Sequence, residues 1–173
     1  MALVFQYGSN TSTTRLNSKN RLAGAAKSLG LAQTEEEFEL DFTYYSRSNG
    51  CAAADLTIGG SKKIYGVLYE IPDEKVFRSK AKGARTLDDI EGEGTAYKRT
   101  TIRVTPVETG QGVREALTYL VKNPVRGLRT NIQYVRHIIE GLREHGAPDE
   151  YIVYVKERAA QNNPCSAAEL VQL

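Results

Sequence analysis

Three groups of residues have types and spacing that could carry out chemistry. Residues 7–10 read YGSN and directly follow an apolar run, and residues 88–94 read DDIEGEG, four acids among glycines. Tyrosines at the following positions fall within or at the ends of expected strands: Tyr65, Tyr69, Tyr97 and Tyr119. Each group also has a purely structural explanation, as a turn, a solvated acidic patch or part of the core.

The YGSN segment could bind an anion through its backbone. A glycine after a strand lets the chain turn sharply and approach a ligand closely. Successive N–H groups in such a turn form a concave anion site, which fits a small carboxylate. A plain turn explains the same residues, because Gly, Ser and Asn are common in turns. Taken alone, the tetrapeptide favours the plain turn.

The DDIEGEG segment offers carboxylates for three different purposes. Metal binding is disfavoured, because the spacing is not that of a calcium loop and no histidine is near. A solvated acidic patch is the usual role of such a run. One carboxylate could instead be a general base, if burial raises its pKa from about 4.3 toward neutrality. Ile90 beside Glu91 permits such burial, although the segment alone favours the acidic patch.

Composition limits the classes of partner. The chain has 173 residues, the size of one domain, which we expect to span residues 1–173. Its 23 basic and 21 acidic residues give a formal charge of +2, so we expect no nucleic-acid partner. The densest basic stretch, residues 78–85, is predicted to be a solvated loop. No stretch approaches the length of a membrane span and no secretory signal is evident, so we expect a cytoplasmic protein without a membrane partner.

The cysteines and histidines indicate no metal or redox site. Cys51 and Cys165 lie in no CxxC or Cys/His pattern, and we expect free thiols in a reducing cytosol. A catalytic thiol would need a nearby histidine. His137 and His145 fall eight positions apart on one predicted helix, which disfavours a shared metal. His145 precedes Gly146, a suitable place for a cation at a helix C-terminus.

Strand patterns occupy most of the first two thirds of the chain. Residues 3–9 read as a buried strand that enters a turn, and residues 37–46 alternate apolar and polar side chains with period two. Residues 52–58 and 62–71 flank Gly59, Gly60 and Ser61, which predicts a hairpin. Residues 97–107 are rich in β-branched side chains and predict a strand. Residues 114–122 fit a helix or a strand equally well.

Helical patterns are short at first and strong at the end. Residues 11–30 could form an irregular helix that ends near Gly30, and residues 87–91 form one predicted turn capped by Thr86. A capping box of Thr130 and Gln133 precedes an apolar stripe at helical spacing, which comprises Ile132, Val135, Ile138, Ile139 and Leu142. A second helix follows Pro148. Strands first and helices last predict one α+β domain.

Read in order, four motifs resemble a known family. Their order and spacing are similar to those of motifs in the γ-glutamylcyclotransferase-like family. The four motifs are VFQYGSN, IYGVLYEI, LDDIEG followed by YKRTTIRV, and TYLV. The resemblance runs over nearly the whole chain and includes the segment TNIQYVRHIIEGLREHGAPDEYI. Members of the family act on γ-glutamyl amino acids, on γ-glutamylamine isopeptides, or as removers of a γ-glutamyl group in antibiotic biosynthesis.

The resemblance implies a fold and a reaction. The fold is a small mixed β-barrel with flanking helices, and the YGSN loop lines its pocket. In the reaction the α-amine of a γ-glutamyl amide attacks the γ-carbonyl, which releases 5-oxoproline and a free amine without metal, cofactor or catalytic cysteine. The acid before the glycine of EG is the general base and maps onto Glu91. We therefore expect Asp88, Asp89 and Glu93 to be surface residues.

The resemblance also assigns roles to the other site residues. Backbone N–H groups around Tyr7, Gly8, Ser9 and Asn10 are expected to hold the substrate carboxylate or the oxygen that gains charge. Tyr119 matches a tyrosine near the acid and is expected to orient it by a hydrogen bond. Tyr97 matches the aromatic position after EG. For both tyrosines a role as an aromatic core residue remains open.

Two departures from the family pattern leave the substrate open. Thr11 stands where the family often has Leu or Met, and the small residues 51–55, CAAAD, could leave room for a larger amine. The sequence does not identify the leaving amine, and it fits a monomer or a homodimer. A module that binds a small carboxylate in the same pocket, without turnover, is the alternative to the enzyme.

Overall fold

The computed structural model describes residues 1–78, 85–108 and 110–173, so most of the basic stretch 78–85 lies outside the described residues. Six strands form the barrel region: β1 (Ala2–Gln6), β2 (Lys27–Ser46), β3 (Cys51–Ile58), β4 (Lys62–Ile71), β5 (Tyr97–Pro106) and β6 (Arg114–Val121). The helices are η1 (Ser9–Thr11), α1 (Thr13–Leu16), α2 (Asp73–Val76), α3 (Leu87–Glu91), α4 (Ile132–Glu144), α5 (Asp149–Asn162), η2 (Pro164–Ser166) and α6 (Ala167–Leu170).

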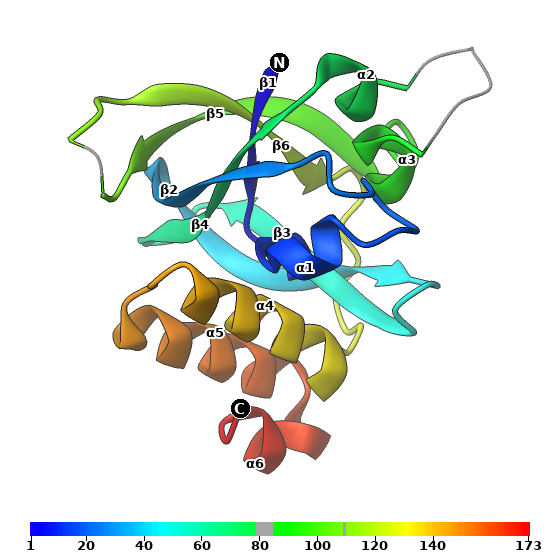
Figure 1. The fold of residues 1–173 in the computed structure, drawn as a ribbon. Helices are drawn as coiled ribbons and strands as arrows, with labels where there is room; N and C mark the ends of the chain where they lie inside the picture. Colours follow the sequence, from blue (N-terminus) through cyan, green and yellow to red (C-terminus); the bar gives the residue numbers. More distant parts are fainter. Residues whose placement is uncertain (79–84, 109) are drawn as a thin grey trace.

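The sheet closes into a barrel. Its strand order is β3-β2-β4-β1-β6-β5, and a further pairing of β2 with β5 closes a ring of five strands. β1 and β6 are parallel and the other pairs are antiparallel, so the barrel is mixed. Helices α4 and α5 lie side by side against it (Figure 1). The predicted α+β fold, a small mixed β-barrel with flanking helices, is confirmed.

The predicted hairpin of residues 52–58 and 62–71 is wrong. Both segments are strands, but β3 and β4 each pair with β2 and do not pair with each other. At the crossover Phe38 pairs with Ile58 on one side and with Lys62 on the other. A Cβ on Gly60 would lie 2.0 Å from the carbonyl carbon of Phe38, so only glycine lets the connection cross there. Because β2 is 20 residues long, it has room for both partners.

The expected irregular helix over residues 11–30 is also largely wrong. Helix α1 covers only Thr13–Leu16, and β2 already begins at Lys27. The side chain of Asn17 accepts from the Ala26 amide at 2.9 Å and donates to the Ala26 carbonyl at 2.8 Å. This pair of bonds closes a compact loop, as asparagine side chains do when they replace backbone partners. Gly30 lies inside β2 at a register shift, with φ of 95°, and ends no helix.

Both C-terminal helices are present as predicted, but the residue that caps the first of them differs from the prediction. The side chain of Asn131, not of Thr130, accepts from the Tyr134 amide at 2.8 Å and starts α4. The Thr130 backbone instead bonds the side chains of two asparagines at the end of α5, so it joins the two helices. The predicted apolar stripe faces the core, and Gly146, with φ of 71°, ends the helix. Burial lowers the pKa of His145 at the helix end, which opposes the expected cation.

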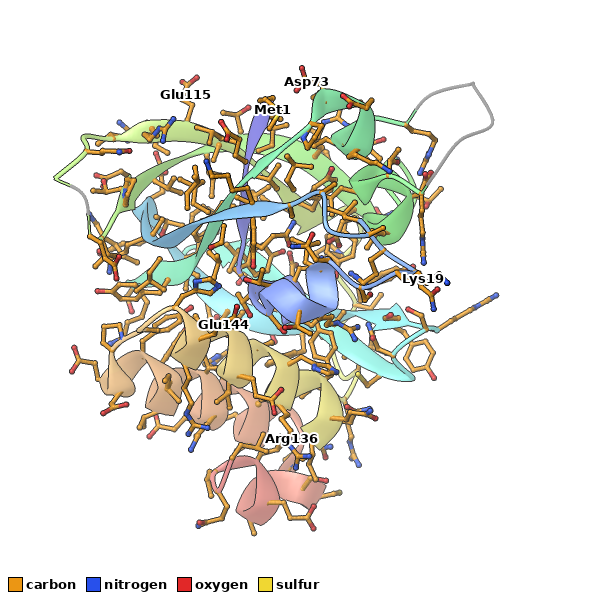
Figure 2. All side chains as sticks on the ribbon, viewed as in Figure 1. Met1, Lys19, Asp73, Glu115, Arg136 and Glu144 are labelled. Atoms are coloured by element: carbon orange, nitrogen blue, oxygen red, sulfur yellow. The ribbon has the colours of Figure 1, made fainter. Side chains whose placement is uncertain are left out.

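Helix α4 packs directly onto the loop that follows β1. The Thr11 hydroxyl bonds the carbonyls of Gly8, at 2.9 Å, and Ile138, at 3.2 Å. A Cβ on Gly141 would lie 2.3 Å from the Ser12 amide nitrogen, so a glycine is required at this contact. Glu144 lies where the end of α4 meets α1 (Figure 2). Thr11, which departs from the family pattern, therefore makes contacts within the loop and with α4.

The remaining expectations concern thiols, metals and membranes. Cys51 is buried and Cys165 exposed, and both are free thiols, as expected. Across the described ranges, no group of three or more His, Cys, Asp or Glu side chains is placed to hold a metal ion. None of the helices in the described part of the chain is long and apolar enough to cross a bilayer.

Candidate active site

One cavity of about 320 Å³ gathers the seven residues expected to form the site, whereas Tyr65 and Tyr69 do not line it. Its lining includes Tyr7, Gly8, Ser9, Asn10, Glu91, Tyr97 and Tyr119. These residues come from the loop after β1, the end of α3, β5 and β6. Segments up to 112 positions apart are in direct contact, because the Tyr7 hydroxyl donates to the Tyr119 carbonyl at 2.5 Å.

The YGSN segment leads into the short 3-10 turn η1, and the first backbone N–H groups of this turn make no hydrogen bond within it. The Thr11 amide bonds the Gly8 carbonyl at 3.0 Å, which starts η1 at Ser9. Ser9 and Asn10 are the first residues of this turn, so their N–H groups have no partner inside it. Gly8 has φ of −93°, which any residue can adopt. A Cβ on Gly8 would lie 3.2 Å from the Tyr134 hydroxyl, a tight contact, and 3.4 Å from Ala54, an ordinary one, so the space beside Gly8 is limited.

Glu91 is placed by the one-turn helix that the sequence predicted. Thr86 and Asp89 form a reciprocal capping box at its start, and Gly92, with φ of 64°, ends it in the left-handed conformation. Glu91 is the last residue of α3 and turns its carboxylate toward the YGSN loop. The side-chain amide nitrogen of Asn10, Nδ2, donates to Glu91 Oε1 at 2.6 Å. Two motifs separated by 81 positions thus meet in one hydrogen bond.

The electrostatics around Glu91 suit a group that exchanges a proton. Burial raises the pKa of Glu91, while the Arg21 charge, the Asn10 hydrogen bond and the Arg15 charge act in the opposite direction. Burial is the largest of these effects, so the pKa lies above its ordinary value. A carboxyl group whose pKa is raised toward neutral pH can both take and return a proton.

Asn10 contributes its side chain as well as its backbone. The residue is 4% exposed, and its Oδ1 accepts from Arg21 Nη2 at 2.6 Å. This bond fixes the amide so that its NH₂ group faces Glu91. The sequence predicts a binding role for the backbone amides of this loop. The structure shows, in addition, a chain of side-chain hydrogen bonds from Arg21 through Asn10 to Glu91. Arg21 belongs to the segment that was predicted as an irregular helix.

The three site tyrosines line the cavity, but their hydroxyls bond the framework. Tyr119 donates to Asp88 Oδ1 at 2.8 Å, so the expected hydrogen bond to Glu91 is wrong. Tyr97 donates to the Ala54 carbonyl at 3.1 Å, and its ring packs edge-on against Tyr44 with centroids 5.4 Å apart. Burial raises the pKa of Tyr7, Tyr97 and Tyr119, which keeps these hydroxyls protonated. All three positions are therefore both core and pocket wall.

Asp88 is not the surface residue that was expected. It is 3% exposed and accepts from Arg99 Nη1 at 2.6 Å, from Tyr119 at 2.8 Å and from the Arg78 amide at 3.0 Å. A buried carboxylate needs such partners, because an unpaired charge in the interior is strongly unfavourable. Asp89 is exposed, as expected, but it caps α3 and pairs with Arg78 at 2.7 Å. Glu93 is partly exposed.

The structure adds pocket residues that the patterns did not indicate: Arg15, Arg21, Tyr44, Asn49 and Tyr134. The Tyr134 hydroxyl accepts from the Ala54 amide at 3.0 Å, and burial raises its pKa to about 12. Tyr134 lies on α4 beside the apolar stripe, so its position resembled that of a core residue. Ala53 and Ala54 also line the cavity, which agrees with the small-residue wall expected from residues 51–55.

Comparison with known proteins agrees with this geometry. The model of the AIG2-like family matches residues 63–155, more than half of the chain. The chain belongs to the AIG2-like family. The matched range contains α3 and Glu91 and begins after the YGSN loop. The search of curated proteins found no match.

Three solved structures share the fold of this chain. A structure described as γ-glutamyl cyclotransferase is 24% identical, with a TM-score of 0.75 over 90% of this chain and 86% of that one. The uncharacterized human protein loc79017 gives the same values. YkqA from Bacillus subtilis is 21% identical, with a TM-score of 0.73, and the match covers 93% of this chain and 55% of YkqA. The γ-glutamylcyclotransferase-like resemblance is thus confirmed, with the fold as its common feature.

Proposed function

We propose that this AIG2-like chain is a cyclotransferase that releases 5-oxoproline and a free amine from a γ-glutamyl amide. One observation carries the proposal: Glu91, with its raised pKa, faces the YGSN loop inside a single cavity and accepts a 2.6 Å hydrogen bond from Asn10. The fold shared with a γ-glutamyl cyclotransferase supports it.

The reaction requires positioning and one proton carrier. The substrate supplies its own nucleophile, the α-amine, which attacks the γ-carbonyl carbon and closes a five-membered ring. The bond from that carbon to the leaving nitrogen then breaks. Holding the folded conformer contributes up to about 7–11 kcal/mol in the best intramolecular cases. Glu91 takes a proton from the α-ammonium and returns one to the leaving amine, a contribution of ~10²–10⁴-fold.

The other residues hold the substrate in this proposal. The N–H groups of Ser9 and Asn10, which have no partner within the turn, bind the α-carboxylate or stabilise the oxygen that gains charge. The rings of Tyr7, Tyr97 and Tyr119 shape the wall, since their hydroxyls bond the framework. Arg21 acts through Asn10 and keeps its amide directed at Glu91.

A panel of γ-glutamyl amides tests the proposal. The purified chain is incubated with conjugates of amino acids, dipeptides, the ε-amine of lysine and aminoglycoside-like amines, and 5-oxoproline is measured by mass spectrometry. We expect release from at least one conjugate. Absence of 5-oxoproline from every conjugate would refute the proposal. Thermal stabilisation by a conjugate without product would favour the alternative, a module that binds a small carboxylate.

Two substitutions in the loop separate backbone from side-chain binding. Ser9→Ala keeps every backbone amide, so we expect a loss in kcat/KM of about tenfold or less. Gly8→Val places bulk against Tyr134 and Ala54 and displaces the loop. A displacement of this kind can lower the rate by ~10²-fold. Steady-state kinetics on both variants, after circular dichroism confirms folding, checks the ranking, and the opposite ranking contradicts backbone binding.

A further inference from the structure

A second cavity, of about 290 Å³, adjoins the candidate active site. The walls of this apolar pocket include Tyr44, Tyr45, Thr95, Ala96, Val125 and Leu128. Tyr44, Thr95 and Ala96 also line the first cavity, so the two cavities share a border. A substrate held in the first cavity therefore has a neighbouring space into which it can extend.

Backbone hydrogen bonds hold the walls of the apolar pocket in place. The Val125 amide donates to the Thr43 carbonyl at 2.8 Å, which fixes the segment after β6 against β2. The Ala96 amide donates to the carbonyl of Gly92, the residue after Glu91, at 2.9 Å. Because the walls do not depend on a ligand for these bonds, the pocket is preformed, as small-molecule sites usually are.

The two cavities differ in charge. The first has charged side chains in its lining, among them Arg15, Arg21 and Glu91, whereas none of the described residues that line the apolar pocket is charged. A γ-glutamyl group carries both an ammonium and a carboxylate, so it belongs in the first cavity. A charged group would lose hydration in the second cavity without gaining an ionic partner there.

The apolar pocket has the size and surface to bind a ring. A cavity of about 150 Å³ is enough to hold benzene, and this pocket measures about 290 Å³. Tyr45 and Val125 are 51% and 52% exposed, so a bound group would remove apolar surface from water. The rings of Tyr44 and Tyr45 also offer faces and edges for contact with another aromatic ring.

The shared border lies close to Glu91 in the chain and in space. Thr95 Oγ1 donates to the Gly92 carbonyl at 2.9 Å, so the border is attached to the residue that follows Glu91. Tyr44 and Thr95 reach the surface, and Ala96 is buried but small. A group can therefore cross the border without displacing a large core side chain.

Only one part of the substrate can occupy the second cavity. The γ-glutamyl part is constant and closes into a five-membered ring, whereas the substituent on the leaving nitrogen varies in length. Glu91 returns a proton to that nitrogen, which must come within hydrogen-bond reach of the carboxylate. The substituent thus begins beside Glu91, next to the border, and extends away from the ring that forms.

We propose that the apolar pocket binds an uncharged apolar group, aromatic or branched aliphatic, on the leaving amine. This rests on the proposed function and narrows its substrates to γ-glutamyl amides of apolar amines. The first cavity then holds the reacting atoms and the pocket selects the amine by burial of its apolar surface.

Three conjugates test the pocket. γ-Glutamyl-phenethylamide and γ-glutamyl-ethylamide share the reacting atoms and differ in one phenyl ring. We expect kcat/KM to favour the phenethylamide by about ten- to a hundredfold, mainly through KM. The conjugate of 1,3-diaminopropane ends in an ammonium and should show no such gain, because the pocket offers it no ionic partner. An equal gain for this third conjugate would contradict an apolar pocket.

A matched pair of substitutions connects the preference to the pocket. Val125→Asp puts a carboxylate on the wall and keeps the backbone bond to Thr43, so the phenethylamide should lose most of its advantage. Val113→Asp is the control. Both valines are 52% exposed and lie outside helices and strands, but Val113 lines neither cavity. The control should keep the preference.

A binding measurement separates failure of the pocket from failure of the proposed function. Calorimetry with the Glu91→Gln variant compares the Kd values of the phenethylamide and the ethylamide. Tighter binding of the phenethylamide supports the pocket even if no conjugate yields 5-oxoproline. Equal Kd values overturn the pocket and leave cyclotransferase activity standing, and a dimer that Val125→Asp dissociates would then assign this surface to a second copy. A preference that Val125→Asp leaves intact, or that both valine substitutions lower equally, also overturns it.

Discussion

Glu91→Gln is expected to lower 5-oxoproline formation by about 10²–10⁴-fold while the fold remains intact. The amide has the shape of the carboxylate and can still accept the hydrogen bond from Asn10, but it cannot take a proton from the α-ammonium. The kcat/KM of the best conjugate, with circular dichroism as a check of folding, gives the result. Equal rates in the variant and the parent would remove Glu91 from the mechanism.

Glu93→Gln is the matched control for this substitution. It makes the same chemical change two positions away, on a partly exposed residue that does not line the cavity. We expect its kcat/KM to equal that of the parent. A similar loss in both variants would indicate a general effect of charge on this segment. It would not support a specific proton transfer.

The raised pKa of Glu91 gives the same variant a second signature. Because the folded state binds the Glu91 proton more tightly than the unfolded state, the unfolding free energy falls as pH rises between the two pKa values. A glutamine side chain does not titrate, so Glu91→Gln should gain stability relative to the parent as pH rises above about 4.3. The acid limb of kcat/KM should also lie above that pH. Urea titrations across pH check this, and a falling difference would contradict it.

Asp88→Ala is expected to destabilise the fold by about 1.5–3 kcal/mol, the usual contribution of hydrogen bonds to a charged group. The substitution leaves the Arg99 charge without its 2.6 Å partner and the Tyr119 hydroxyl without its acceptor. It also removes the acceptor of the Arg78 amide. Because Asp88 belongs to α3, which carries Glu91, activity should fall with stability. Urea denaturation measures the loss.

Asp73→Ala provides the contrast with an exposed pair. Asp73 lies beside the N-terminal ammonium at 3.0 Å, but the two groups are 59% and 52% exposed (Figure 2). Such pairs contribute about 0–1 kcal/mol. The two aspartates thus share a type of contact and differ in burial. Equal losses for Asp73→Ala and Asp88→Ala would contradict the assignment of Asp88 to the core.

Local features of the fold could be predicted because neighbouring residues decide them. Thr86, Asp89 and Gly92 cap a one-turn helix by contacts within six positions, so the position of Glu91 at its end was predictable. Period-two alternation in β2 and the apolar stripe of α4 follow from burial of one face. The order of the family motifs then indicated the YGSN loop and Glu91 together.

Strand pairing could not be predicted in the same way. The hairpin rule joins consecutive strands through a short glycine turn, and residues 59–61 fit it well. The long β2 instead takes β3 and β4 on opposite edges, and Gly60 permits the crossing because it has no side chain. Closure of the barrel, which pairs β2 with β5, outweighs the local preference for a hairpin.

By itself the sequence determined the one-turn helix that ends at Glu91, the turn at YGSN and the apolar faces of the last helices, since short-range contacts suffice for each. Only the tertiary structure decided that Asp88 is buried against Arg99, that Tyr119 bonds Asp88 and not Glu91, and that Arg21 reaches Asn10. These contacts join positions from 11 to 31 residues apart, and barrel closure sets their geometry. Arg15 and Arg21, which the sequence pattern placed in a polar helix, likewise reach the cavity that contains Glu91 only in the tertiary structure.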